Sequence, residues 1–329
     1  MQKVLVTGAT GFTGYFLAQR LSQSGFHVVA PLRENSDVSN LKKLSNIEIV
    51  TGDITNRQFI EQIVNKDIYA IFHLAAAFRK ANVPKKIYWD VNYNSTKYLL
   101  EEAASKKIKK FIHCSTGGVL GHIKNPPATE TAPYAPGDIY QKSKCEGEKL
   151  VISYFQHNKI QGSIIRPTAI YGPGDLRLLK FFKLIKNKKF IMLGQGTVFY
   201  HMVYISDLVD AFLLCLKKDA ANGEIFIIGG EQYVSLNQLV QLIAKSVQAP
   251  SPKIKLPFWP VWALSALIEL FCAPFKITPP IYRRRIDLFR KSRAFDISKA
   301  KKILGFQPKV NLETGISLTA KWYKQNNLI

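Results

Sequence analysis

The sequence predicts an α/β fold: a doubly wound parallel sheet in the first half of the chain, followed by a smaller mixed α/β cap. Three observations carry this prediction. Short apolar runs alternate with helical patterns up to about residue 167, a glycine-rich turn follows the first run, and the alternation loosens after Pro167. Strands that alternate with helices at this spacing form βαβ units, whose strands lie parallel in one sheet.

Apolar runs of strand length mark the expected strands of the first half. They cover residues 3–7, 26–32, 47–51, 68–73, 111–114 and 162–166. Helical periodicity fills the intervals at residues 12–24, 55–65, 83–105 and 139–158. In the first of these helices, Leu17 and Leu21 lie one turn apart, which predicts a buried face.

After Pro167 the pattern predicts more helix than strand. Helices are expected at residues 176–187, 206–217, 236–247, 261–272 and 312–323, and strands at 201–205 and 224–228. Because no linker rich in Gly or Ser separates the halves, the cap is expected to pack against the first domain. The predicted domains are residues 1–167 and 168–329, with a segment around 201–218 returning to the core of the first.

The charge of the chain points to an anionic partner. The 329 residues include 46 Lys and Arg against 23 Asp and Glu, a formal net charge of +23. Phosphate groups, nucleic acid and membrane surfaces all attract such a chain. No nucleic-acid-binding motif accompanies the basic clusters, and no aromatic residues are interleaved with them, so nucleic acid is not expected as a partner.

Cysteine and histidine usage excludes two classes of site. The four cysteines are far apart and form no CxxC pair, and the six histidines form no HxH or HExxH arrangement. We therefore expect neither a disulfide framework nor a metal site. This usage fits a reducing compartment, and the absence of an apolar signal region at the start predicts a cytoplasmic location.

One apolar stretch, residues 256–275, requires its own interpretation. Glu269 and three prolines, Pro257, Pro260 and Pro274, make it a poor membrane span. The expectation is a buried helix with proline-marked ends. A role at a membrane surface is the alternative.

The glycine-rich turn after the first strand predicts a dinucleotide site. Its glycines recur as GxxGxxG, which permits a tight turn and lets a pyrophosphate approach the start of the next helix. The residues expected to bind the cofactor here are Gly8, Thr10, Gly11, Phe12, Thr13 and Gly14.

The end of the second expected strand bears on the choice between NAD and NADP. An Asp or Glu there would accept hydrogen bonds from the ribose 2′-OH of NAD. The chain instead has Arg33, which could hold a 2′-phosphate in a bidentate grip and so favours NADP. The neighbouring Glu34 weakens this preference and leaves NAD open.

Tyr140 and Lys144 form the candidate catalytic pair. At positions i and i+4 of a helix they share one face, and a nearby ammonium favours the phenolate of a group whose pKa is ordinarily near 10. A phenol poised in this way can exchange a proton with a substrate hydroxyl while hydride moves to or from a nicotinamide. The preceding strand ends in Ser115 and Thr116, and Thr116 could hydrogen-bond the reacting oxygen.

Together these motifs resemble those of extended short-chain dehydrogenases/reductases, in the NAD(P)-dependent epimerase/dehydratase family. The resemblance spans nearly the whole chain and implies a Rossmann-type doubly wound sheet, a substrate-binding cap and an NAD(P) cofactor. Homodimers are frequent in the family, which leaves a homodimer open here. The motifs that carry it are residues 7–14, 52–54, 73–76, Asn92, 114–121, Tyr140 with Lys144, 166–174, 201–211 and 223–230.

The resemblance implies a role for each matching residue. Tyr140 would be the general acid/base, Lys144 would lower its pKa and bind ribose, and Thr116 would orient the substrate, with Ser115 as the alternative hydroxyl. The remaining implied contacts are Asp53 to the adenine amine with Ile54 beside the ring, Leu74, Ala75 and Ala76 along the cofactor, Asn92 in support of the active-site helix, and Pro167 near the nicotinamide.

Departures from the family pattern narrow the chemistry. Gly117 and Gly118 stand where 4,6-dehydratases carry an Asp-Glu pair, which disfavours dehydration. Thr168 and Ala169 stand where many nucleotide-sugar epimerases carry Asn, which bears on the substrate. Gly117 and Thr168 are therefore candidate substrate residues, as is Arg283, whose basic cluster either holds a diphosphate or is a solvated face.

The function expected is NAD(P)-dependent oxidation or epimerisation of a secondary alcohol on a small molecule, a sugar or nucleotide-sugar. The alternative is an enzyme similar to 3β-hydroxysteroid dehydrogenases or dihydroflavonol reductases, acting on an apolar alcohol or ketone; it is favoured by Arg33, Thr168 and the aromatic run around Phe258 and Trp262. A non-catalytic nucleotide-binding protein is the third hypothesis, and the intact Tyr140 and Lys144 pair argues against it.

Overall fold

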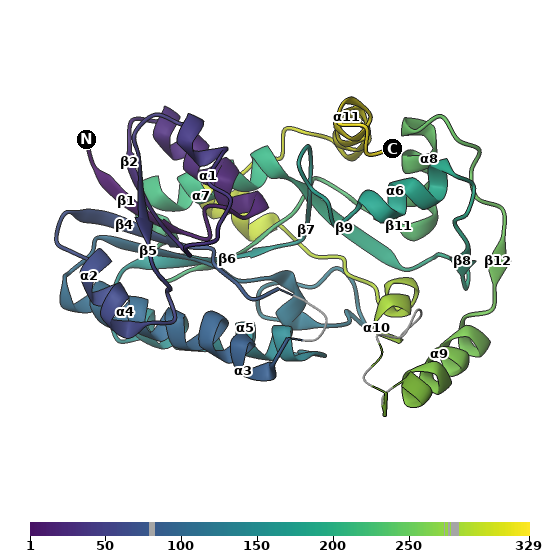
Figure 1. The fold of residues 1–329 in the computed structure, drawn as a ribbon, viewed down its shortest axis with the longest axis horizontal. Helices are drawn as coiled ribbons and strands as arrows, with labels where there is room; N and C mark the ends of the chain where they lie inside the picture. Colours follow the sequence, from purple (N-terminus) through teal and green to yellow (C-terminus); the bar gives the residue numbers. More distant parts are fainter. Residues whose placement is uncertain (79–82, 273, 276, 278–282) are drawn as a thin grey trace.

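Seven parallel strands form the main sheet of this computed structural model, which describes residues 1–78, 83–272, 274–275, 277 and 283–329. Their order is β3-β2-β1-β4-β5-β6-β10 (Figure 1). The bounds are β1 Lys3–Thr7, β2 His27–Leu32, β3 Ile47–Thr51, β4 Ile68–His73, β5 Lys110–Cys114, β6 Gly162–Pro167 and β10 Ile225–Ile228. The strand order reverses between β1 and β4, the place where doubly wound sheets bind ligands at the carboxyl ends of their strands. The predicted doubly wound fold is confirmed.

Helices cover both faces of this sheet. On one face α1 (Phe12–Gln23) packs against α7 (Ile205–Lys217), and on the other α4 (Ser95–Ser105) packs between α2 (Arg57–Ile63) and α5 (Ile139–Gln156). The inner strands are apolar on both sides because successive side chains alternate between two buried clusters, one on each face of the sheet.

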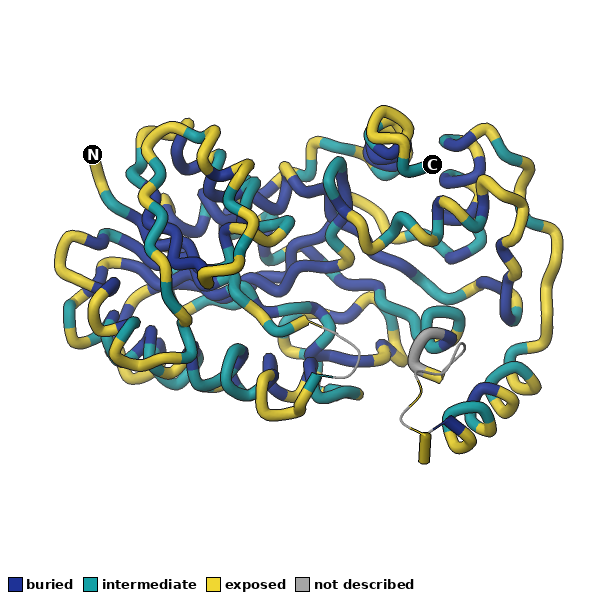
Figure 2. Tube along the Cα trace, viewed as in Figure 1, coloured by how far each residue is buried: buried dark blue, intermediate teal, exposed yellow. Residues whose placement is uncertain are grey.

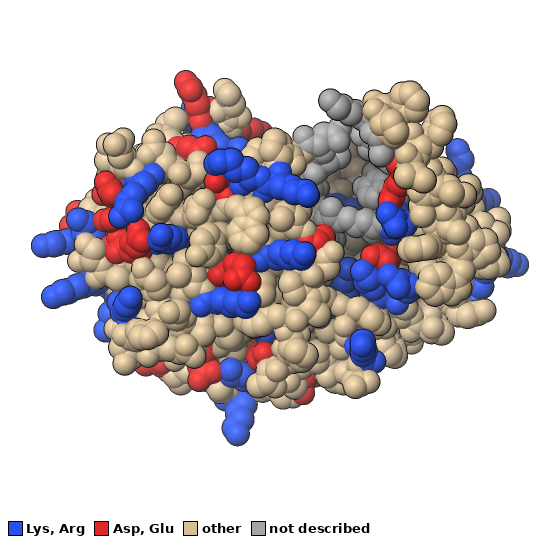
Figure 3. Space-filling model, turned by 90° about the horizontal axis from the view of Figure 1, so that it is seen from below, with Lys and Arg blue, Asp and Glu red and all other residues tan. Residues whose placement is uncertain are grey.

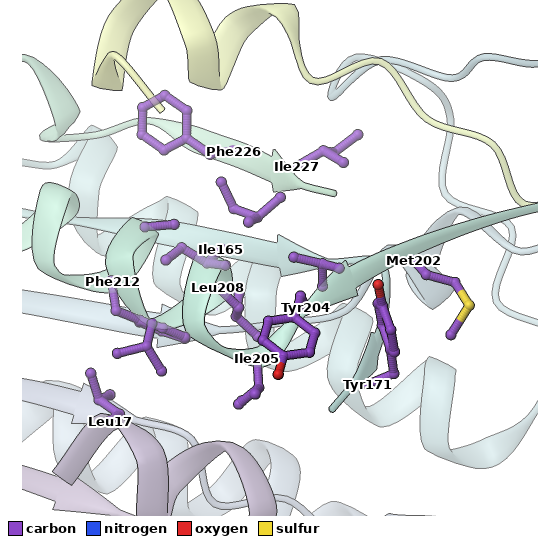
Figure 4. Packing of buried hydrophobic residues seen from close by; sticks show 14 of the residues in the cluster. Leu17, Ile165, Tyr171, Met202, Tyr204, Ile205, Leu208, Phe212, Phe226 and Ile227 are labelled. Carbon is purple, nitrogen blue, oxygen red and sulfur yellow. The ribbon is translucent and has the colours of Figure 1, made fainter. Parts of the chain in front are cut away.

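Figure 4 shows the cluster on the first of these faces. Leu208 and Phe212 of α7 lie between Leu17 of α1 and Ile165 of β6, and all four side chains are fully buried. Tyr204, at the end of β9 (Phe199–Tyr204), leads directly into α7. The core of the sheet thus continues into the strands that follow residue 167.

The rest of the chain forms a smaller mixed layer beside the sheet (Figure 1). Two small sheets lie there, one in the order β11-β9-β7 and one that pairs β8 with β12. Their other strands are β7 Ala169–Tyr171, β8 Met192–Leu193, β11 Tyr233–Ser235 and β12 Lys255–Leu256, and the helices are α6 Leu179–Lys186, α8 Leu236–Ser246, α9 Phe258–Cys272, α10 Arg283–Ile286 and α11 Leu312–Gln325. α7 and β10 both return to the main sheet. The division of the chain at residue 167 stays a prediction.

Short helical segments complete the structure. The expected helix over residues 83–105 is three segments: α3 (Lys85–Trp89), a π-helical turn over Asp90–Asn94, and α4. Such π-helical turns are often found at functional sites. The other short segments are 3₁₀ turns at Leu41–Lys43, Gly117–Leu120, Asp219–Ala221 and Asp287–Phe289 and a π-helical turn at Ala300–Leu304.

The apolar stretch of residues 256–275 forms a helix, but the expectation that this helix is buried is wrong. Only Ser265 and Cys272 of α9 are buried, whereas Leu267 is 63% exposed and Leu270 72%. Figure 2 shows this helix at one end of the molecule, with exposed and intermediate residues along its length and few buried ones. No helix in the described part of the chain is both long and apolar enough to cross a membrane.

Candidate active site

The glycine turn between β1 and α1 is shaped by close backbone approach. Gly8 has φ +75°, and a Cβ on it would lie 2.8 Å from the amide nitrogen of Ala75. A Cβ on Gly14 would lie 2.1 Å from the Gly8 carbonyl oxygen. No side chain in the described chain caps the amides of α1 after Gly11. The turn therefore presents backbone N–H groups at a helix start, the arrangement that binds a pyrophosphate.

A chain of buried hydrogen bonds holds the neighbouring edge of β4. Thr7 Oγ1 accepts from the amides of Leu74 and Ala75, both at 3.1 Å, so its own proton goes to His73 Nδ1 at 2.8 Å. His73 Nε2 then donates to Thr96 Oγ1 at 2.9 Å. Burial and the Lys144 charge lower the pKa of His73 to about 3, so the imidazole is neutral. The wall formed by Leu74 and Ala75 is thus fixed against the turn.

A cleft of about 1290 Å³ extends from the turn across the ends of β1, β2 and β3. The exposed side chains of Arg33 and Asp53 line it, as the sequence predicts for a dinucleotide. Asp53 Oδ1 accepts from both the amide (2.8 Å) and the hydroxyl (2.9 Å) of Thr55, which orients the carboxylate. The predicted neighbour Ile54 packs against the cluster beneath and does not line the cleft.

Sequence reasoning missed three charged residues of this cleft: Asp37, Asp175 and Arg177. Asp37 lies on the same side as Arg33 and Glu34. Arg177 lines the far side, with its guanidinium 5.4 Å from the centre of the Phe12 ring and its Nε donating to the buried Asp175 at 2.6 Å. The turn at residues 171–174 was the sequence feature that could have drawn attention to Arg177. Nothing in the sequence indicates that Asp37 lies in the cleft beside the glycine turn.

The start of α5 places Tyr140 and Lys144 beside the end of β5. Tyr140 is 8% exposed, and its ring meets Phe78 edge to face at 5.0 Å between centroids. Lys144 is buried, and its Nζ donates to the Cys114 carbonyl at 2.7 Å with His113 Nε2 at 3.4 Å. Burial lowers the pKa of Lys144, and burial together with the Lys144 charge lowers the pKa of His113 well below its usual value.

The two hydroxyls at the end of β5 are used differently. Thr116 Oγ1 accepts from the Gly118 amide at 3.0 Å, so its proton can be donated to a substrate oxygen. The Ser115 hydroxyl donates to the buried Glu148. The structure thus engages Ser115 in the protein interior and leaves the Thr116 proton for another acceptor.

A buried ion pair that the sequence analysis did not single out lies beneath this site. Glu148, one turn after Lys144, accepts from Arg166 Nη2 at 2.5 Å and Nε at 3.1 Å, and from the Tyr134 hydroxyl at 2.6 Å. Both charged side chains are 2% exposed or less. The pair joins α5 to β6. The only indication of it in the sequence was that Glu148 lies four residues after Lys144, on the same face of the helix.

Asn92 joins the π-helical turn to the active-site helix. Its Oδ1 accepts from the Ala77 amide at 2.8 Å, and its Nδ2 donates to Ser143 Oγ at 2.9 Å. Ser143 directly precedes Lys144 on α5. The buried amide therefore holds the loop after β4, which includes the exposed Ala76, against the helix.

The three candidate substrate residues lie in different surroundings. A Cβ on Gly117 would lie 3.3 Å from the Pro167 carbonyl, so these two residues lie close together. Thr168 Oγ1 is buried and has no hydrogen-bond partner among the described residues. Arg283 instead pairs with Glu269 of α9 at 2.8 Å. The side chains of the neighbouring Arg284, Arg285 and Lys276 lie outside the described residues.

Comparisons with known proteins agree with this geometry. A family model described as the NAD dependent epimerase/dehydratase family matches residues 4–229. The decarboxylating sterol-4-alpha-carboxylate 3-dehydrogenase of Candida albicans is 28% identical, with 99% of both chains covered. The UDP-glucose 4-epimerase of Vibrio cholerae is 26% identical, with 99% of this chain and 97% of that protein covered.

Solved structures give the same picture. The UDP-glucose 4-epimerase of Thermotoga maritima with UDP-glucose superposes with a TM-score of 0.79 at 25% identity and 99% coverage of both chains. The UDP-glucuronic acid 4-epimerase of Bacillus cereus in complex with NAD gives 0.77 at 27% identity, with 98% of this chain and 99% of that one covered. Relatives of two kinds, nucleotide-sugar epimerases and sterol dehydrogenases, thus match along the whole chain.

Proposed function

The chain belongs to the NAD dependent epimerase/dehydratase family, and from this premise we propose that it oxidises or epimerises a secondary alcohol with Tyr140 as the general acid/base. It is an extended short-chain dehydrogenase/reductase of the epimerase/dehydrogenase type. One observation carries the proposal: α5 sets Tyr140 and the buried cation Lys144 one turn apart, and Lys144 bonds the Cys114 carbonyl at the end of β5, two residues before Thr116.

The residues at the turn fit a dinucleotide. Gly8 and Gly14 carry no Cβ that would collide with neighbouring backbone, so the turn can close tightly and present its N–H groups at the start of α1 to a pyrophosphate. We assign the adenine end to Asp53, without the Ile54 contact expected from the sequence, the pyrophosphate to residues 8–14, and the inner part to Leu74, Ala75, Ala76 and Pro167. When bound, NAD(P) supplies the hydride acceptor or donor at nicotinamide C4.

The side chains of the site then have distinct roles. The Tyr140 oxygen takes the proton from the substrate hydroxyl, or returns it in the reverse direction. The Lys144 ammonium favours the phenolate, and of its three N–H donors Cys114 and His113 account for two, which leaves one for a cofactor ribose. Thr116 donates to the substrate oxygen and orients it. Asn92 positions α5 and does not touch the reacting atoms.

We propose a nucleotide-sugar as the first substrate class, supported by relatives named UDP-glucose and UDP-glucuronate 4-epimerases. An apolar alcohol is the second, supported by the match to the sterol dehydrogenase. Gly117 and Thr168 are the residues proposed to face the substrate in either case.

A thermal-shift panel separates the two classes. With saturating NAD(P), UDP-glucose or UDP-glucuronate is expected to raise Tm with a saturable concentration dependence, because ligands that bind only the folded state stabilise it by mass action. A hydroxysterol or hydrophobic ketone that raises Tm while every UDP-sugar fails would contradict the first class and support the second.

We propose a preference for NADP because of Arg33. The related epimerase whose structure contains NAD does not support this preference. If its guanidinium holds a 2′-phosphate, Arg33→Ala is expected to raise the Kd of NADP about tenfold and leave that of NAD within about twofold. Glu34→Gln is the opposite variant and is expected to lower the Kd of NADP, because it removes a negative charge that repels a 2′-phosphate. Fluorescence titration with NADH and NADPH measures both constants. Equal losses for the two cofactors would show that Arg33 does not select between them.

A further inference from the structure

Helix α9 turns an entirely apolar face to the outside. Successive residues of a helix are turned by about 100° around its axis, and on this basis all exposed residues of α9 fall within an arc of about 140°. Leu267 is 63% exposed, Leu270 72% and Phe271 72%. The residues of this arc, called here the apolar face, are Trp259, Pro260, Ala263, Leu264, Leu267, Leu270 and Phe271.

The polar groups of α9 are on its other side. Glu269 is the only charged residue of the helix, and its carboxylate accepts from the Arg283 amide at 2.5 Å and from Arg283 Nε at 2.8 Å. Ser265, also on that side, is buried and donates to the Trp262 carbonyl at 2.7 Å. A surface helix normally exposes its polar side to solvent. In α9 the apolar side is exposed and the polar side faces the protein.

The apolar surface continues into the neighbouring strand pair. Ile254 is 56% exposed, and Leu256 of β12 and Ile191, beside β8, are each 41% exposed. The Ile254 carbonyl accepts from the Met192 amide, which holds the two segments side by side. Large exposed apolar patches of this kind mark interaction sites.

The segment that carries this surface is rich in basic residues. Residues 250–293 contain nine Lys and Arg against two acids, Glu269 and Asp287. Both acids are neutralised locally, Glu269 by Arg283 and Asp287 by Arg290 at 3.1 Å and Lys291 at 2.6 Å. Figure 3, seen from the side of α9, shows uncharged surface at the right-hand end with Lys and Arg side chains beside it.

We propose that this end of the molecule docks on the surface of a membrane that carries anionic lipids. Apolar and aromatic side chains such as Trp259 and Phe271 would enter the headgroup boundary, and Lys253 and Lys255, both exposed, would meet the lipid phosphates. The 15 residues of α9 span about 22 Å, less than the roughly 30 Å of a bilayer core, so the helix would lie in the surface.

The segment after α10 also approaches the start of the active-site helix. Lys291, which pairs with Asp287 next to α10, lies with its Nζ 3.9 Å from where a Cβ of Gly137 would be. Gly137 lies three residues before Tyr140. The segment that follows α10 therefore reaches the start of α5, although docking itself does not depend on the reaction.

Flotation of the full chain with phospholipid vesicles tests the proposal. The protein is expected to float with vesicles of phosphatidylcholine and phosphatidylglycerol, and to bind less to phosphatidylcholine alone or at high salt. Leu267→Glu with Leu270→Glu is expected to lower the partition coefficient at least about tenfold, because charge cannot enter the headgroup boundary with the helix. Leu318→Glu, at a leucine of α11 that is 41% exposed, is the matched control and is expected to bind as wild type.

The charge contribution is tested separately. Lys253→Glu with Lys255→Glu is expected to weaken binding to the anionic vesicles only, whereas Lys321→Glu, at an exposed lysine of α11, leaves it unchanged. Tm of every variant confirms that it is folded. Absence of flotation, or equal flotation of the Leu267/Leu270 variant and the Leu318 control, would overturn the proposal. A third result would also overturn the proposal: light scattering shows a dimer, the Leu267/Leu270 variant abolishes that dimer, and the protein binds no vesicles. A second copy of the chain would then cover the apolar face.

Discussion

Replacing Tyr140 by Phe is expected to lower kcat by about 10²- to 10⁴-fold while the Kd of NAD(P) changes by less than about twofold. The substitution removes the oxygen that exchanges the proton and keeps the ring that packs on Phe78. Steady-state turnover and cofactor titration on the same preparation measure the two effects.

The control for this variant is Tyr154→Phe, the same change at a half-buried tyrosine of the same helix. Its turnover is expected to equal that of wild type. Lys144→Met is a companion variant, expected to impair both turnover and cofactor binding, because the ammonium serves the phenolate and the ribose. Full activity of Tyr140→Phe would exclude Tyr140 as the general acid/base.

The second large effect concerns stability. Glu148→Ala is expected to lower the free energy of unfolding by about 3–5 kcal/mol, because it leaves the Arg166 guanidinium buried without its anion. It also removes the acceptor of the Ser115 and Tyr134 hydroxyls. Urea unfolding followed by circular dichroism gives the difference.

Glu146→Ala is the matched control for Glu148. Glu146 lies two residues earlier on α5 and pairs with Lys149 at 2.8 Å, but both side chains are exposed to solvent. Its loss is expected to cost less than about 1 kcal/mol. If the two variants lose similar stability, the buried network does not hold α5 to β6 as described.

The strands of the main sheet could be predicted closely from the sequence. Lys3–Thr7, Ile47–Thr51 and Ile68–His73 begin and end where the apolar runs do. Strands covered on both faces are apolar at successive positions, so the run and the strand coincide. Two- and three-residue strands such as Met192–Leu193 were not predicted, because a run of that length carries no period.

The burial of α9 could not be predicted for a different reason. Hydropathy predicts that residues such as Leu267 and Phe271 avoid water, but not which part of the chain, if any, covers them. The helix is present as predicted, and the described residues cover only one side of it.

In the candidate site, residues that lie close together in the sequence could be predicted to act together, whereas contacts between distant residues could not be predicted. The i, i+4 pair Tyr140 and Lys144 is visible in the sequence because both residues lie on one helix. The contact between Glu148 and Arg166 joins two elements, and the approach of Arg177 to Phe12 joins residues far apart in the chain. Only the fold brings such residues together.

The most direct test of the central claim is the absorbance of the bound cofactor at about 340 nm, where reduced nicotinamide absorbs and the oxidised form does not. Wild-type protein loaded with NAD(P)⁺ and mixed with a secondary alcohol of either proposed class is expected to develop this band within the time of one turnover. Tyr140→Phe, with its cofactor still bound, is expected to develop it at least about a hundredfold more slowly. A wild-type band that forms equally fast in the variant would contradict the assignment of proton transfer to Tyr140.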